Sequence, residues 1–378
     1  MAEPRFPRPG LAVVKVGSNT LRAADGRLDR DQVATIAAMV ADARQEGVEV
    51  VVVSSGAVAA GIGLLGLPGR PTDMTTLQSA ASVGQGELIN TYQRHLAERG
   101  IPCGQVLLTQ DDFVRRGRYL NARSTLRRLL ALGAVPVVNE NDAVATEELA
   151  YGDNDRLASL VASMLDADVL VILSDVAGLH TADPRTVAGA FLVSRVDDPA
   201  DVDLESLGGV GSFVGKGGMR SKVDAARVAV LSGCQAVVAD GRRPGVLADV
   251  LSGEDVGTWF VAQPRRLEAR RLWIGFALDA HGRIHVDAGA AEALTGRGTS
   301  LLAVGVTRVA GGFATGDAVE VVAPDGAVIA RGLVNYDADD LAKVAGMRTA
   351  DAGRELGDRF TREVIHRDDL VVLASERT

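Results

Sequence analysis

The sequence has very few lysines. Of 40 basic residues in the 378-residue chain, only Lys15, Lys216, Lys222 and Lys343 are lysines, and arginine supplies the rest. A lysine retained in such a chain favours a site that needs a compact ammonium group rather than a planar guanidinium. Three of the four lie beside glycine turns, where backbone can approach phosphate closely. We expect functional roles for Lys15 and Lys222, while Lys216 stays open between function and chance.

Cysteine, histidine and aromatic residues are also scarce. Cys103 and Cys234 show no CxxC spacing, which argues against a disulfide framework or a zinc site. The five histidines form no HExxH or Ser/His/Asp pattern, so the hydrolase and zinc-enzyme classes lose support. Aromatic residues make up 4% of the chain, so the core must consist of Ala, Val, Leu and Ile.

Long hydrophobic runs and excess positive charge are absent too. The apolar runs are too short to span a bilayer, and residues 1–10 lack the apolar segment of a signal peptide. The net charge of −9 argues against general affinity for nucleic acid or an anionic membrane. We therefore expect a soluble, cytoplasmic protein with no membrane partner.

Short apolar runs alternate with amphipathic segments over the first two thirds of the chain. This alternation predicts an α/β fold, a three-layer sandwich with a largely parallel central sheet. The expected strands are residues 11–16, 48–53, 105–108, 135–138, 169–173 and 236–239, and the expected helices are residues 29–45, 58–65, 75–99, 121–132, 156–165 and 223–231.

The pattern changes after Gln263 to short β-runs separated by glycine turns. We predict a small, separate β-rich domain there. The expected strands are residues 283–287, 301–306, 318–322, 328–333 and 370–373. The predicted bounds are residues 9–263 for the first domain, 264–280 for a linker, 281–364 for the small domain and 365–378 for a C-terminal segment.

Polar groups follow four of the predicted strands directly. They are Gly17-Ser18, Ser54-Ser55-Gly56, the run from Asn139 to Asp142, and Ser174-Asp175. Ligands of open α/β sheets gather outside the carboxyl ends of the strands. The sequence therefore predicts a site at this edge, although Ser174-Asp175 is equally consistent with an Asx turn.

A glycine-rich stretch at residues 211–222 runs into a predicted helix. Lys222 there and Lys15 at the end of the first strand are placed to contact phosphate oxygens. The N–H groups of Gly217 and Gly218 would add partial positive charge. Neither GxGxxG nor GxxxxGK[ST] is present, so a nucleotide site must have another design.

A second polar stretch, residues 139–155, suits a small zwitterionic ligand. Asp142 would bind an ammonium group and the asparagines would orient a carboxylate. Asp155 would hold the lysine ammonium groups in place, although Asn154 or Asp155 also fits a helix N-cap. Asp175 would serve a nucleotide or Mg²⁺.

Seven motifs carry a family resemblance. They are VVKVGSNTL at residues 13–21, VVVSSGAVAAG at 51–61, LNARSTL at 120–126, VPVVNENDAVAT at 135–146, GDNDRLAS at 152–159, GLHTADPR at 178–185 and GGMRSK at 217–222. In this order they resemble the glutamate 5-kinase family of the amino-acid kinase superfamily. The tail from His281 resembles a PUA domain.

The resemblance implies an amino-acid kinase fold and ATP-dependent phosphorylation of the γ-carboxylate of L-glutamate, the first step of proline synthesis. It implies catalytic roles for Lys15, Lys222 and Asp155, and Mg²⁺ held by the nucleotide phosphates with no direct metal ligand. Glutamate would be held by Ser55, Asp142 and Asn154. The nucleotide would be bound by Lys15, Ser174, Asp175, Lys216, Gly217, Gly218, Met219, Arg220, Ser221 and Lys222.

The resemblance also implies inhibition by proline, transfer of the acyl phosphate to glutamate-5-phosphate reductase, and assembly as a homodimer or homotetramer. One position departs from the family pattern, because Lys216 stands where the family has Thr or Ser. We expect Lys216 to tighten nucleotide binding rather than to catalyse transfer.

Two alternative functions remain. The first is another amino-acid kinase, such as acetylglutamate kinase or aspartokinase, against which the NENDAV and GDNDRLAS runs and the β-rich tail count. The second is RNA binding by the PUA-like tail, beside a basic patch of Arg265, Arg266, Arg270 and Arg271. The acidic net charge argues against RNA binding.

Overall fold

The chain divides into two compact units, Met1–Leu267 and Glu268–Thr378, which we describe separately. The computed structural model describes residues 4–109, 111–144, 154–182, 184, 187, 189–202, 218–264, 271, 274–275, 278 and 280–373. Among the described residues, no helix is both long enough and apolar enough to cross a membrane.

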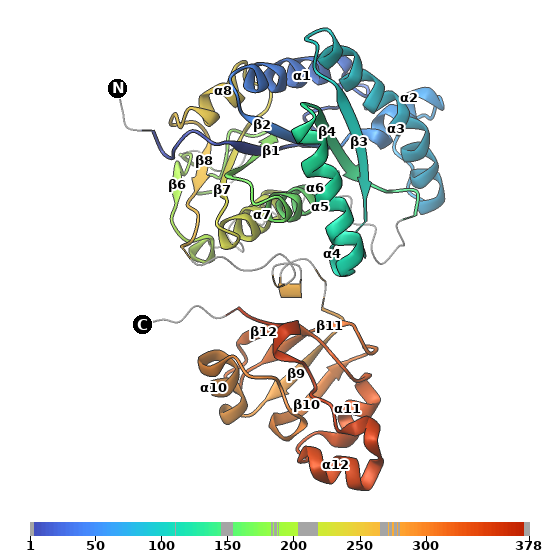
Figure 1. The fold of residues 1–378 in the computed structure, drawn as a ribbon, viewed down its shortest axis with the longest axis vertical. Coiled ribbons are helices and arrows are strands. Elements are labelled where there is room, and N and C mark those ends of the chain that lie inside the picture. Colours follow the sequence, from blue (N-terminus) through green and yellow to red (C-terminus); the bar gives the residue numbers. More distant parts are fainter. Residues whose placement is uncertain are drawn as a thin grey trace. The chain divides into compact units, whose positions relative to one another are not determined.

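The N-terminal unit contains an eight-stranded sheet (Figure 1). Every neighbouring pair of strands runs parallel except β7 and β8, so the predicted largely parallel sheet is confirmed. The strands are β1 (Leu11–Val16), β2 (Glu49–Ser54), β3 (Cys103–Leu108), β4 (Val135–Glu140), β5 (Val169–Ser174), β6 (Arg195–Val196), β7 (Gln235–Asp240) and β8 (Thr258–Phe260), in the order β3-β4-β2-β1-β5-β7-β8-β6.

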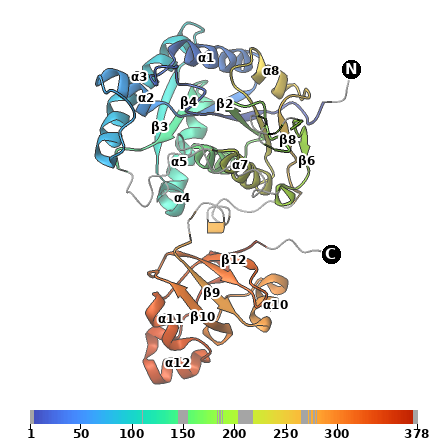
Figure 2. The ribbon, with the colours of Figure 1, turned by 180° about the vertical axis from the view of Figure 1, so that it is seen from behind.

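Helices cover both faces of this sheet, which confirms the predicted three layers. The helices α1, α3 and α8 lie on one face and α5, α6 and α7 on the other, as Figure 1 and the reverse view in Figure 2 show. The described helices are α1 (Arg30–Gln45), α2 (Ala57–Leu64), α3 (Met74–Ala97), α4 (Asp111–Val114), α5 (Arg116–Ala131), α6 (Asn154–Met164), α7 (Met219–Leu231) and α8 (Val246–Leu251).

The central strands β1 and β5 are buried at every residue. Their sequences, LAVVKV and VLVILS, are apolar as expected for strands covered on both faces. Lys15 is the one charged residue in the two strands. Because a buried ammonium group needs a compensating charge, its position already points to a polar cluster at the carboxyl end of β1.

Two glycines bring α2 and α3 into close contact. A Cβ atom at Gly61 of α2 would overlap the backbone of Ala80 on α3, and one at Gly84 of α3 would overlap the backbone of Ala57 on α2. No larger residue fits at either position without moving a helix. The contact holds α3 against the polar end of the sheet.

The structure differs from the sequence prediction in a few elements of this unit. The predicted helix at residues 223–231 begins four residues earlier, at Met219, because Gly218 adopts an extended N-cap conformation. This places Lys222 in the first turn of the helix. The short elements β6, β8, α4 and α8 were not predicted, since two to six residues carry too little periodicity to be recognised.

The C-terminal unit contains a separate five-stranded sheet, which confirms the predicted β-rich domain. Its strands pair antiparallel except for β9 and β11. The strands are β9 (Gly282–Val286), β10 (Val306–Gly311), β11 (Ala318–Val322), β12 (Val328–Leu333) and β13 (Leu370–Val372), in the order β10-β9-β11-β12-β13.

The sequence prediction for this unit missed three helices, α10 (Ala288–Arg297), α11 (Ala338–Val344) and α12 (Thr349–Leu356). The predicted strand at residues 301–306 is wrong. Leu301 forms an isolated bridge with Ile365, a 3-10 turn follows at Ala303–Gly305, and β10 begins only at Val306. The apolar residues of this tight turn form a short run of the kind that is typical of a strand, which explains the wrong prediction.

Candidate active site

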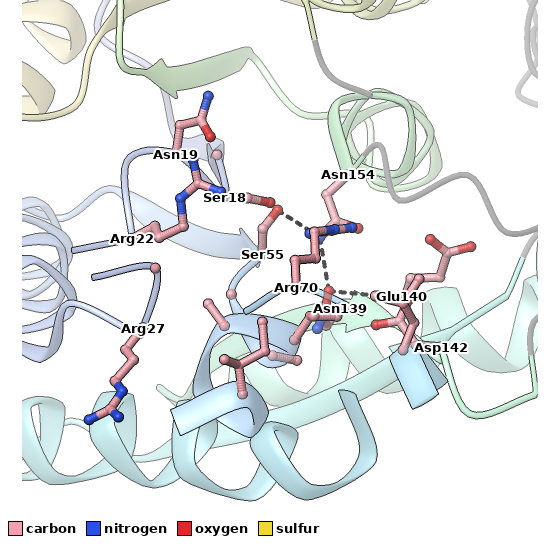
Figure 3. Close-up of a pocket in the computed structure, with 18 of the residues that line it drawn as sticks. Ser18, Asn19, Arg22, Arg27, Ser55, Arg70, Asn139, Glu140, Asp142 and Asn154 are labelled. Carbon is pink, nitrogen blue, oxygen red and sulfur yellow. Dashed lines mark hydrogen bonds between the residues drawn. The ribbon is translucent and has the colours of Figure 1, made fainter. Parts of the chain in front are cut away.

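A cavity of about 640 Å³ lies at the carboxyl end of the parallel strands in the N-terminal unit. Lys15 of β1, Asn139 of β4 and Ser174 of β5 reach it directly, and Ser55 reaches it from the turn after β2. Figure 3 shows part of its lining. The site thus lies at the edge of the sheet where the sequence placed it.

Asp155 connects the two lysines. Its carboxylate is fully buried in the first turn of α6, where Oδ1 forms an ion pair with Lys15 and Oδ2 lies 3.2 Å from Lys222 Nζ. Lys15 is 4% and Lys222 6% exposed, and both line the cavity. Three elements, β1, α6 and α7, therefore meet in one Lys-Asp-Lys cluster.

The charge of this cluster favours an anionic ligand. Burial by itself raises the pKa of the Asp155 carboxyl, but the adjacent Lys15 and Lys222 outweigh burial and hold that pKa below its usual range. One carboxylate between two ammonium groups leaves a net positive charge at the wall of the cavity. A phosphoryl group placed there would supply the missing negative charge.

Ser221 secures the orientation of Asp155. Its hydroxyl donates to Asp155 Oδ2 at 2.8 Å and also lies 3.0 Å from the carbonyl oxygen of Gly218. The serine therefore joins the start of α7 to the carboxylate between the lysines. The cluster is held from the backbone of α7 as well as by charge.

Hydrogen bonds link the side-chain amides of Asn139 and Asn154 into a chain (Figure 3). Asn139 Nδ2 donates to Gln85 Oε1 of α3 at 2.7 Å, while Asn139 Oδ1 accepts from the backbone N–H of Glu140 and from Asn154 Nδ2, both at 2.9 Å. Each atom of the Asn139 amide thus has a complementary partner. This fixes which way the amide faces.

The same chain fixes Asn154. Its Nδ2 donates to Asn139, to Ser55 Oγ at 3.0 Å and to the carbonyl oxygen of Ser54 at 3.1 Å. Its Oδ1 is buried and accepts no hydrogen bond from any described residue. Because Asn154 lines the cavity, this oxygen is an acceptor available to a ligand.

Asp142 also lines the cavity. Burial raises the pKa of its carboxyl to about 6, and the positive charge of Arg70 opposes this rise. An ammonium group bound here would stabilise the ionised form. Asp142 and Asn154 Oδ1 together suit a ligand with a protonated amine.

Ser174 and Asp175 lie at the carboxyl end of β5 and line the same cavity. Asp175 Oδ2 accepts from Asn19 Nδ2 at 3.2 Å, and the Ser174 hydroxyl lies 3.2 Å from Asp175 Oδ1. The pair is therefore bound to the turn after β1 and is more than a local turn.

The cavity is lined by seven of the twelve predicted site residues that the structure describes. Gly218 is the N-cap of α7, and Met219 and Arg220 begin that helix without lining the cavity. Lys216 and Gly217 lie outside the described residues. The predicted residues that line the cavity are Lys15, Ser55, Asp142, Asn154, Ser174, Asp175 and Lys222.

Sequence reasoning did not single out Gln85, Asn19 or the cavity arginines Arg22, Arg27 and Arg70. Gly84 inside a predicted helix could have marked the close approach of α3 to α2, but it gives no sign of the hydrogen bond that Gln85 makes. Nothing in the pattern distinguished these arginines from the many others in the chain.

Comparison with known proteins places this chain in a family. The model of the amino acid kinase family matches residues 10–240, and the model of the PUA domain matches residues 282–356. The glutamate 5-kinase of Salinispora arenicola is 49% identical over 362 residues, which are 96% of this chain and 97% of that protein. The chain belongs to the glutamate 5-kinase family.

Other glutamate 5-kinases agree with this assignment. The one from Myxococcus xanthus is 50% identical over 361 residues, covering 96% of both chains. The family resemblance inferred from the sequence motifs is therefore confirmed, and so is the PUA domain at the C-terminus. Among solved structures, UMP kinase from Bacillus anthracis matches with a TM-score of 0.47 and 15% identity, covering 68% of this chain and 97% of that chain.

Proposed function

We propose that this chain transfers the γ-phosphoryl group of ATP to the γ-carboxylate of L-glutamate, the first step of proline synthesis. The observation that carries the proposal is the buried Lys15–Asp155–Lys222 cluster at the wall of a cavity that also contains Asp142. The cluster suits a phosphoryl group, and Asp142 suits an amino-acid ammonium group. Membership of the glutamate 5-kinase family supports this assignment.

The proposed reaction needs no general base. A γ-carboxylate oxygen of glutamate attacks the γ-phosphorus, and the new O–P bond forms as the bond from that phosphorus to the β–γ bridging oxygen breaks. The electron pair of that bond leaves with ADP. Because the carboxylate is already an anion near neutral pH, the absence of histidine from the described cavity lining agrees with this chemistry.

In this mechanism Lys15 and Lys222 neutralise charge on the transferring group. Phosphoryl transfer depends mainly on positioning and charge stabilisation. Asp155 keeps both ammonium groups in place, and Ser221 keeps Asp155 oriented. We assign Ser55, Asp142 and Asn154 to glutamate.

We assign the nucleotide to Ser174, Asp175 and the glycine-rich stretch up to Lys222, and we retain the expected binding role of Lys216. Among the described residues, no group of three or more His, Cys, Asp or Glu side chains is arranged to hold a metal ion. Mg²⁺ would enter with the nucleotide, as the family resemblance implies, and the Asp175 carboxylate at the cavity would be a suitable oxygen donor to it. Bound there, it would reduce the negative charge of the nucleotide.

Further parts of the sequence prediction belong to this proposal. They are feedback inhibition by proline, transfer of the acyl phosphate to glutamate-5-phosphate reductase, assembly as a dimer or tetramer, a cytoplasmic location, and the domain bounds given above.

A substrate comparison tests the proposal. ADP release is measured with ATP, Mg²⁺ and either L-glutamate, N-acetylglutamate or L-aspartate. We expect turnover with glutamate, because an acetylated amine has no charge for Asp142 and aspartate is one methylene shorter. Turnover with N-acetylglutamate or aspartate and none with glutamate would overturn the proposal.

A further inference from the structure

Arg70 is a cation in the cavity that the proposed reaction does not use. It lies in the turn between α2 and α3 and lines the cavity together with Asp142. Among the described residues it forms no ion pair and donates no hydrogen bond, yet its charge acts on Asp142. Figure 3 draws it among Ser55, Asn139, Asn154 and Asp142.

The charges of the cavity are thus arranged in two groups. The Lys15–Asp155–Lys222 cluster is at one wall, and Asp142 and Arg70, which carry opposite charges without forming an ion pair, lie beside the amide chain. An α-amino acid carries an ammonium group and a carboxylate on the same carbon atom. The protein groups that bind them must therefore be neighbours, and a cation next to the acid that binds the ammonium group meets this requirement.

We propose that Arg70 binds the α-carboxylate of the substrate while Asp142 binds its α-ammonium group, so that Arg70 determines the choice of an α-amino acid. This inference rests on the proposed function and identifies the residue that recognises the α-carboxylate of the substrate. A guanidinium group can hold a carboxylate through two parallel hydrogen bonds, which fixes the direction of the substrate as well as its charge.

The other cavity arginines fit this role less well. Arg27 lies 3.7 Å from Asp25 and already has a carboxylate partner. Arg22 lies on the side of Ser18 and Asn19 in Figure 3, and Asn19 donates to Asp175. Of the three arginines in the described lining, Arg70 is the one whose charge acts on Asp142.

The test compares steady-state kinetics of the full chain with Arg70→Leu and Arg70→Lys, with Arg27→Leu as a matched control from the same cavity. Thermal melting checks that each variant is folded. In Arg70→Leu we expect the KM for glutamate to rise roughly 10- to 100-fold, with kcat and the KM for ATP within about twofold. The KM of Arg70→Lys for glutamate should lie between those of wild type and Arg70→Leu, because lysine keeps the charge but loses the paired hydrogen bonds.

A substrate without the α-carboxylate separates recognition from a structural effect. For 4-aminobutyrate we expect kcat/KM to be the same in wild type and Arg70→Leu. The ratio of kcat/KM for glutamate to kcat/KM for 4-aminobutyrate should therefore be smaller in the variant. An unchanged KM for glutamate, an equal loss with both substrates, or an equal effect of Arg27→Leu would overturn the role of Arg70. Wild-type chain that does not phosphorylate glutamate at all would instead remove the proposed function, and this inference with it.

Discussion

Asp155 is fully buried between two lysines, and its carboxylate balances part of their charge. We expect Asp155→Ala to lower the free energy of unfolding by about 3 to 5 kcal/mol, because it leaves two ammonium groups buried together. Urea unfolding followed by circular dichroism measures this change. The activity should fall as well, since the lysines lose their fixed positions.

Ser221→Ala is the matched control for Asp155→Ala. It removes one hydrogen bond to the same carboxylate and leaves the charges in place. A loss of about 1 kcal/mol is expected. If the two variants were equally stable, the ion pairs would not support the fold at this position.

Asp142 gives the site a pH dependence. Its pKa is raised to about 6 by burial, so in the free protein the carboxylate is ionised above that pH and neutral below it. The ionised form binds the substrate ammonium group. We therefore expect the KM for glutamate to be constant above about pH 7 and to rise as the pH falls through about 6, measured between about pH 5 and 8.

Asp142→Asn is the control for this profile. It should bind glutamate weakly at every pH and lose the rise near pH 6, because the amide does not titrate. A wild-type profile that is flat to pH 5, or an Asn variant that keeps the rise, would place the titrating group elsewhere.

At the level of elements, the contact between α2 and α3 depends on glycine. We expect Gly84→Ala to destabilise the protein by about 1 to 3 kcal/mol, since its methyl group would overlap the backbone of α2. Gly86→Ala, two residues along the same helix, meets no atom and should stabilise by up to about 1 kcal/mol. Chemical denaturation of the two variants distinguishes them, and equal effects would show that close packing is not the cause.

Some helices and strands could be predicted from the sequence and others could not. Strands of the central sheet were predictable because a parallel sheet covered on both faces needs continuous apolar runs, such as those at Val13 and Leu170. The start of α7 was not predictable, because Gly217 and Gly218 are typical of a loop and give no signal for the start of a helix. In the C-terminal unit α10 was missed, since its sequence AGAAEALTGR lies between two strands and is rich in small residues.

The residues of the candidate site also divide into those that could be predicted from the sequence and those that could not. Lys15, Lys222 and Asp155 were recognisable from lysine scarcity and from their places beside turns and strand ends. Gln85 was not, because its role depends on a hydrogen bond to Asn139 across 54 residues of chain. Long-range partners of this kind are set by packing, and no local pattern encodes them. Arg70 could be identified only from the structure, because its position in the cavity lining distinguishes it from the other arginines.

At the level of the whole molecule, net charge bears on the alternative of RNA binding. The chain carries a charge of −9, and of the proposed basic patch only Arg271 is among the described residues, while Arg265, Arg266 and Arg270 lie outside them. We expect the full chain to bind structured RNA no more tightly than the non-specific range of about 10⁻⁶ to 10⁻⁴ M in filter binding. Tighter binding that weakens steeply with added salt would contradict this and assign the PUA domain an RNA partner.

The most direct test of the account is whether the Lys15–Asp155–Lys222 cluster transfers phosphate to a carboxylate of glutamate. The chain is incubated with ATP, Mg²⁺ and L-glutamate in the presence of hydroxylamine, which traps an acyl phosphate as a hydroxamate. We expect hydroxamate to form in step with ADP, and Lys222→Ala to lower both rates by roughly 100-fold or more. ADP release without hydroxamate, or a Lys222→Ala variant as active as wild type, would contradict it.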